Sequence, residues 1–111
     1  MACTTVDDFC RANGVDKIDV LKVDAEGYDL HVIKGASRML SEGRIDFIYA
    51  EFNDLLPKPG TSGGGLVPMG EYLAPFGFRY VATYTDFILP GAEMFVSANV
   101  LFARTASGVA T

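Results

Sequence analysis

The sequence predicts an α/β fold, in which helices alternate with the strands of a largely parallel sheet. Residues 18–23, IDVLKV, form a short apolar run rich in β-branched residues, which is typical of a buried parallel strand. Residues 28–40 then repeat apolar side chains at helical spacing, so one long amphipathic helix is expected. The acidic turn between them, residues 24–27 (DAEG), ends the strand where βαβ units bind ligands.

The elements on either side of this unit follow from capping residues and hydrophobic runs. Thr5 is suited to cap a helix that Gly14 ends, and Asp8 occupies the capping-box position. Gly43 is expected to end the long helix. Residues 45–52 (IDFIYAEF) carry apolar side chains on both faces, which indicates a central strand covered by helices.

The second half of the chain predicts one helix and two strands. Residues 57–65 are rich in proline and glycine and predict a flexible loop. Pro68 is suited to the first turn of a helix that Gly77 would end. Strands are expected at 78–84 and 98–103, and they should pair antiparallel because their connection is too short for a crossover helix.

Composition limits the classes of function. The 111 residues, half of them hydrophobic, are expected to form one domain over residues 1–104 and a disordered tail at 105–111. A net charge of −5 without a basic stripe argues against a nucleic-acid partner. No apolar run approaches the roughly 20 residues of a membrane span, and no signal peptide is evident. We therefore expect a cytosolic protein with Cys3 and Cys10 reduced.

Several motifs point to one family. They are VDDFC at 6–10, IDVLKVDAEG at 18–27 and VIKGA at 32–36, with Ile48 and Glu51 on the next strand. The combination resembles the C-terminal half of the FkbM family of S-adenosylmethionine-dependent methyltransferases. The resemblance implies the second half of a Rossmann-like class I methyltransferase sheet, with the first three strands and the glycine-rich cofactor loop missing. Its strands would lie in the order 18–23, 45–52, 98–103, 78–84.

Candidate site residues lie at the ends of the first two strands. Asp24 follows one strand and Glu51 lies near the end of the next, and neighbouring strands are about 4.8 Å apart, so both carboxylates should share one crevice. Either is suited to act as the catalytic base that takes a proton from an acceptor hydroxyl. By the resemblance, Asp24, Glu26, Gly27 and Tyr28 are expected to bind the cofactor, S-adenosylmethionine.

Most of these residues also have a purely structural interpretation. Asp24 could serve only as the N-cap of the long helix, and Glu26 and Asp29 could only complement its dipole. Tyr28 is expected in the core. Asp24 and Asn53 could hold Mg²⁺, a hypothesis that rests on analogy, and Asn53 is also a common turn former.

Three functions remain open. The leading one, implied by the resemblance, is O-methylation of a hydroxyl on a sugar or another small metabolite. The second is a non-catalytic fragment that forms a homodimer, because strand 18–23 would lie at an apolar sheet edge through which two copies could pair. The third and least favoured is a hydrolytic pair, Asp24 and Glu51, which would need carboxyl groups about 5 Å apart as in retaining glycosidases.

Overall fold

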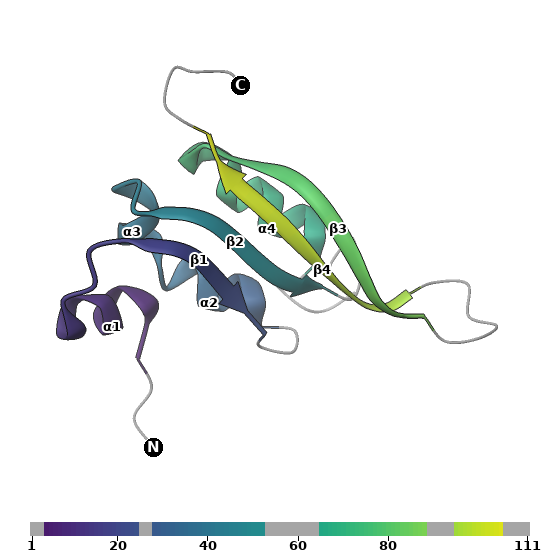
Figure 1. The fold of residues 1–111 in the computed structure, drawn as a ribbon, viewed down its shortest axis with the longest axis horizontal. Helices are drawn as coiled ribbons and strands as arrows, with labels where there is room; N and C mark the ends of the chain where they lie inside the picture. The colour runs from purple at the N-terminus through teal and green to yellow at the C-terminus, as the bar shows by residue number, and fades with distance from the viewer. Residues whose placement is uncertain (1–3, 25–27, 53–64, 89–94, 106–111) are drawn as a thin grey trace.

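The computed structural model describes residues 4–24, 28–52, 65–88 and 95–105, and the structural statements below concern these residues. Helices and strands alternate along the first half of the chain, and two long strands form the last part (Figure 1). The elements are α1 (Val6–Asn13), β1 (Ile18–Val23), α2 (Asp29–Lys34), α3 (Ser37–Ser41), β2 (Ile45–Phe52), α4 (Leu66–Leu73), a 3₁₀ turn (Ala74–Phe76), β3 (Phe78–Ile88) and β4 (Phe95–Arg104).

The strands form one mixed sheet in the order β1-β2-β4-β3. β1 and β2 are parallel, with Val23 opposite Ala50, and β4 is antiparallel to both β2 and β3. This confirms the α/β class, the predicted strand order and the antiparallel last pair. The view that the sheet is the second half of a larger Rossmann-like sheet remains a proposal.

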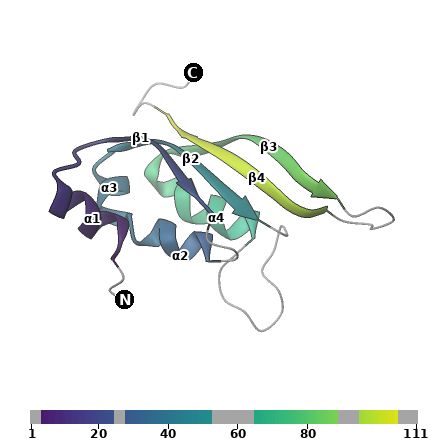
Figure 2. The same ribbon diagram turned by 60° about the horizontal axis from the view of Figure 1, so that its bottom comes forward.

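The described helices cover one face of the sheet (Figure 2). The core lies between the helices and that face, and its fully buried side chains include Ile33, Leu40, Ile48, Met69, Leu73 and Val100. On the opposite face Phe47 is 41% exposed and Tyr84 49% exposed, and Val20 on β1 is 55% exposed. The prediction of strands buried on both faces is therefore wrong, because β1 is an edge strand and β2 has helices on one side only.

The prediction of a single long helix over residues 28–40 is also wrong, because two helices, α2 and α3, occupy this segment and the break falls at Gly35 and Ala36. The break is stabilised by Asp7 of α1. Its carboxylate accepts hydrogen bonds from the backbone N–H groups of Arg38, at 2.9 Å, and Met39, at 3.0 Å. Its own N–H donates to the Gly35 carbonyl. A carboxylate from a distant helix thus satisfies N–H groups that an unbroken helix would bond internally.

The predicted helix caps are confirmed. The Thr5 hydroxyl accepts a hydrogen bond from the Asp8 N–H at 3.1 Å, and Gly14 ends α1 with a left-handed φ of 66°. Gly77 ends the 3₁₀ turn with φ 89°. Both late strands are longer than predicted. Thr105, at the start of the predicted tail, donates from its N–H to the Gly77 carbonyl, whereas residues 106–111 and most of the predicted loop lie outside the described residues.

Within the described ranges, none of the helices has the length and apolar character that a membrane crossing requires. The cytosolic location expected above stays a prediction.

Candidate functional site

The carboxyl ends of β1 and β2 bring the two predicted catalytic carboxylates to one edge of the sheet. Val23 and Ala50 are paired in the parallel register, so Asp24 and Glu51 occupy the next position on each strand. Asp24 is exposed and Glu51 is half-buried. Two carboxylates at adjacent strand ends can meet one small ligand, which is the arrangement expected from the sequence.

Asp29, at the start of α2, is the residue that sequence reasoning undervalued. It is 2% exposed and is the one buried charged side chain among the residues described. Its Oδ2 accepts a hydrogen bond from the backbone N–H of Glu51 at 2.8 Å. Asp29 lies in the first turn of α2, where it can complement the helix dipole, and its carboxylate also joins the start of α2 to the end of β2.

Tyr28 and Asp24 do not have the structural roles considered for them. Tyr28 is 71% exposed, so its predicted place in the core is wrong. It is also the N-cap residue of α2, which excludes Asp24 from that role. The phenol and the Asp24 carboxylate are both accessible to a ligand, which fits their expected contact with the cofactor. Glu26 and Gly27, the other two predicted cofactor residues, lie outside the described part of the chain.

A row of polar and aromatic residues continues from Glu51 across the helix-free face. Glu51 pairs with Asn99 on β4, and Asn99 pairs with Tyr84 on β3. Tyr49, two residues before Glu51 on β2, places its ring 6.2 Å from the ring of Tyr84. The alternation of aromatic and polar residues in 78–84 was visible in the sequence, but the registers that align the three strands were not.

A metal site is not formed by the residues that the structure describes, since they include no cluster of three histidine, cysteine or acidic side chains placed to bind an ion. Asn53, the proposed partner of Asp24 for Mg²⁺, lies outside these residues. The magnesium hypothesis therefore stays a prediction.

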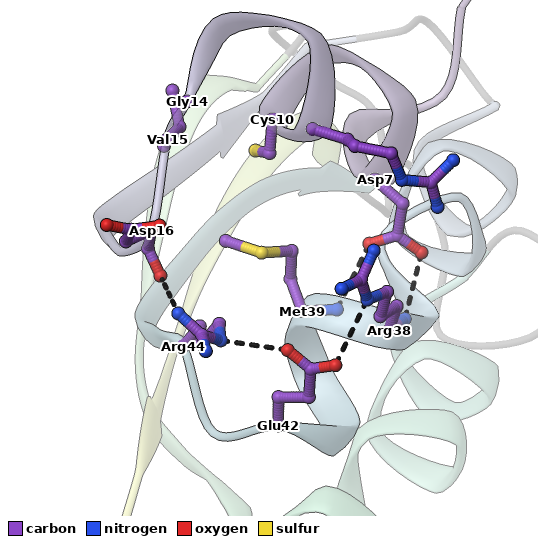
Figure 3. A pocket seen from close by; sticks show the side chains of 10 residues that line it. Asp7, Cys10, Gly14, Val15, Asp16, Arg38, Met39, Glu42 and Arg44 are labelled. Carbon is purple, nitrogen blue, oxygen red and sulfur yellow. Dashed lines mark hydrogen bonds and ion pairs between the residues drawn. The ribbon is translucent and has the colours of Figure 1, made fainter.

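A hollow lies at the opposite end of the sheet, between α1, α3 and the turn before β1 (Figure 3). Its volume is about 240 Å³, and the buried side chains Cys10 and Met39 contribute to its lining. Its charged lining residues balance, with three acidic and three basic side chains: Asp7, Asp16, Glu42, Arg11, Arg38 and Arg44.

Three of the charged side chains around this hollow, Glu42, Arg38 and Arg44, bond to one another. Glu42 accepts from Arg38 at 3.0 Å and from Arg44 at 2.8 Å, and Arg44 also donates to the carbonyl of Asp16 (Figure 3). The hydrogen bond from Arg38, with that from Arg44, lowers the pKa of Glu42 below its usual value. Since Glu42 pairs with both arginines and Asp7 accepts backbone N–H groups of α3, we interpret the hollow as a structural junction.

The chain matches the sequence model of one protein family, the methyltransferase FkbM domain. The match covers residues 1–80 of the 111 residues. The chain belongs to the FkbM methyltransferase family. This confirms the resemblance found in the sequence motifs. A search of curated proteins and a search of solved structures gave no match.

The matched region of this FkbM domain contains the acidic turn, Asp29, Glu51 and the first residues of β3, up to residue 80. A methyltransferase domain generally uses S-adenosylmethionine as the methyl donor. The edge of the sheet that carries Asp24, Tyr28 and Glu51 is therefore the candidate active site of the domain.

Proposed function

We propose that this domain transfers a methyl group from S-adenosylmethionine to a hydroxyl of a sugar or another small metabolite. The observation that carries the proposal is the parallel register, which puts Asp24 and Glu51 at neighbouring strand ends. The family match supports the methyltransferase class, and the exposed Asp24 and Tyr28 support cofactor binding at this edge. Glu26 and Gly27 complete the proposed cofactor contacts.

The chemistry needs a base and an aligned acceptor. The acceptor oxygen attacks the methyl carbon as the carbon–sulfur bond breaks and its electron pair returns to sulfur, and the hydroxyl proton passes to a carboxylate. Glu51 is the favoured base, because the row of residues that it begins across the sheet includes Tyr84, which is 49% exposed and offers an aromatic face for an acceptor. Asp24 then contacts the cofactor. The hydrolytic alternative lacks any supporting observation beyond the same two carboxylates.

Calorimetric titration of the purified chain with S-adenosylhomocysteine tests the cofactor half of this proposal. We expect binding that Asp24→Ala weakens by about tenfold or more, equivalent to about 1.4 kcal/mol. Asp19→Ala is the matched control, since Asp19 is an exposed aspartate at the other end of the same strand. No binding by the folded chain, or equal losses in both variants, would contradict the proposal.

A second function, a non-catalytic homodimer, is favoured by one observation. β1 lies at the edge of the sheet, and Val20 in its middle is 55% exposed. An apolar edge strand can pair with a second copy of itself. Pairing would show as a dimer in light scattering that Val20→Lys dissociates, whereas Phe9→Lys, at a side chain 53% exposed on α1, leaves it intact. A monomer at every concentration would exclude this function.

A further inference from the structure

Asp29 is the residue from which the structure supports a further role. Its carboxylate is almost fully buried, and it lies beside the buried side chains Leu30 and Ile33 in the same short helix. Removing a carboxylate from water costs several kcal/mol unless hydrogen bonds compensate for the lost hydration. An apolar residue at this position would avoid that cost, so the polar contacts of Asp29 call for an explanation.

The contact made by Asp29 connects the two parts of the candidate site. Asp29 comes directly after Tyr28, so it fixes the point at which the chain leaves the acidic turn. Its Oδ2 receives the Glu51 N–H at 2.8 Å, which fixes the backbone at the residue proposed as base. This hydrogen bond therefore ties the segment that begins at Tyr28 to the backbone of Glu51.

We propose that Asp29 is a positioning residue for methyl transfer, which acts by holding the backbone of Glu51 against the start of α2. This inference rests on the function proposed above. Asp29 itself does not touch substrate, since it is buried. Its contribution is to keep the Glu51 carboxylate and the segment of Asp24 and Tyr28 in one geometry, because small displacements of reacting groups lower turnover strongly.

The inference predicts different behaviour for two substitutions of the same residue. Asp29→Asn keeps an oxygen that can accept the Glu51 N–H, so it should retain most of the turnover. Asp29→Ala removes the acceptor, and we expect kcat to fall by about tenfold or more while KM for the cofactor changes by less than about twofold. Asp29→Ser, which is too short to reach the Glu51 N–H, replaces Asp29→Ala if the alanine variant does not fold.

A double-mutant cycle with Glu51→Gln separates positioning from general destabilisation. If Asp29 acts through Glu51, Asp29→Ala should cost less than about twofold when residue 51 is already glutamine. Hydrogen exchange followed by NMR gives a readout besides activity. The Glu51 amide should exchange about tenfold faster in Asp29→Ala than in Asp29→Asn, with Ala50 little changed.

Asp7→Ala is the matched control, because Asp7 is also an aspartate that accepts backbone N–H groups from a distant element, but at the other end of the sheet. It should leave the Glu51 amide and kcat unchanged at a temperature where it is folded. Equal losses of kcat from Asp29→Ala with and without Glu51→Gln, or an unaltered Glu51 amide, would overturn the inference. Absence of turnover in the unaltered chain would instead contradict the proposed function.

Discussion

The two ends of the sheet use aspartate in different ways. At the amino end of β1 and β2, Asp7 binds the backbone of α3, beside the ion pairs that Glu42 forms with Arg38 and Arg44. At the carboxyl end, Asp29 binds the backbone of β2 at Glu51, and Asp24 follows the neighbouring strand. Where charged side chains only hold helices and strands together, acidic and basic groups are expected to balance. Several acidic side chains at neighbouring strand ends instead indicate a site that binds a ligand or transfers a proton.

The role of a carboxylate at the start of a helix depends on the groups around it. Asp7 and Asp29 are both found in the first turn of a helix, where a carboxylate can complement the helix dipole. In the structure each accepts N–H groups from another element. The difference is that the partner of Asp29 is a candidate base, whereas the partners of Asp7, Arg38 and Met39, start a helix far from the site.

Removing the Asp7 carboxylate is expected to have the largest effect on stability. It tests whether the two ends of the sheet are independent. Asp7→Ala removes two hydrogen bonds to helix N–H groups, and replacing such a cap typically costs about 1–2 kcal/mol. We expect that loss of unfolding free energy in urea titrations, with binding of S-adenosylhomocysteine unchanged in the folded variant. Weaker binding in proportion to the stability loss would show that the two ends are not independent.

A smaller effect is expected from crowding the same junction without removing charge. A Cβ at Gly35 would lie 3.2 Å from the carbonyl oxygen of Val32 and 3.3 Å from the Cβ of Thr5, and both distances are closer than usual packing allows. Gly35→Val should therefore move α1 away from the α2–α3 break and cost about 1 kcal/mol or somewhat more. The melting temperature measures this cost. Gly70→Ala, where the nearest side-chain atom is 3.8 Å away on Phe102, is the control and should be tolerated.

Much of the fold could be predicted because its signals are local. The Thr5 cap, the stop at Gly14 and the strand at 18–23 each depend on a few adjacent residues. The strand order came from the family resemblance. The break between α2 and α3 could not be predicted, because the helical periodicity continues through Gly35 and the cause is Asp7, about 30 residues away in the chain.

Only part of the candidate site could be predicted, because only part of it has a local signal in the sequence. Asp24 and Glu51 follow from strand ends, which a sequence shows directly. The burial of Asp29 and the alignment of Asn99 with Tyr84 depend on contacts between segments far apart, so no local pattern contains them. Tyr28 was misplaced because its helical spacing matches the core positions, although it lies before the first residue of α2.

The smallest expected effect concerns the pH dependence of stability at the amino end. The hydrogen bond from Lys17, at 2.9 Å, is the main cause that lowers the pKa of Asp46, and Arg104 adds to it. Because the folded pKa lies below the unfolded one, Asp46 stabilises the fold above about pH 4–5, and this contribution is lost as the pH falls through the folded pKa. Lys17 is exposed, and Asp46 and Arg104 are only half-buried, so water still screens these ion pairs and the contribution is small.

Asp46→Asn removes this contribution and isolates it. The variant should be slightly less stable than the unaltered chain at pH 7, and the gap should narrow as the pH approaches 3, because protonation then removes the same charge from the unaltered chain. Urea unfolding at pH 7, 4.5 and 3 measures the gap. Asp8→Asn is the control, since Asp8 meets Arg11 only at 3.5 Å on an exposed surface. A constant gap at all three pH values would mean that Asp46 contributes through packing, and the ion pairs would then no longer distinguish the amino end from the carboxyl end.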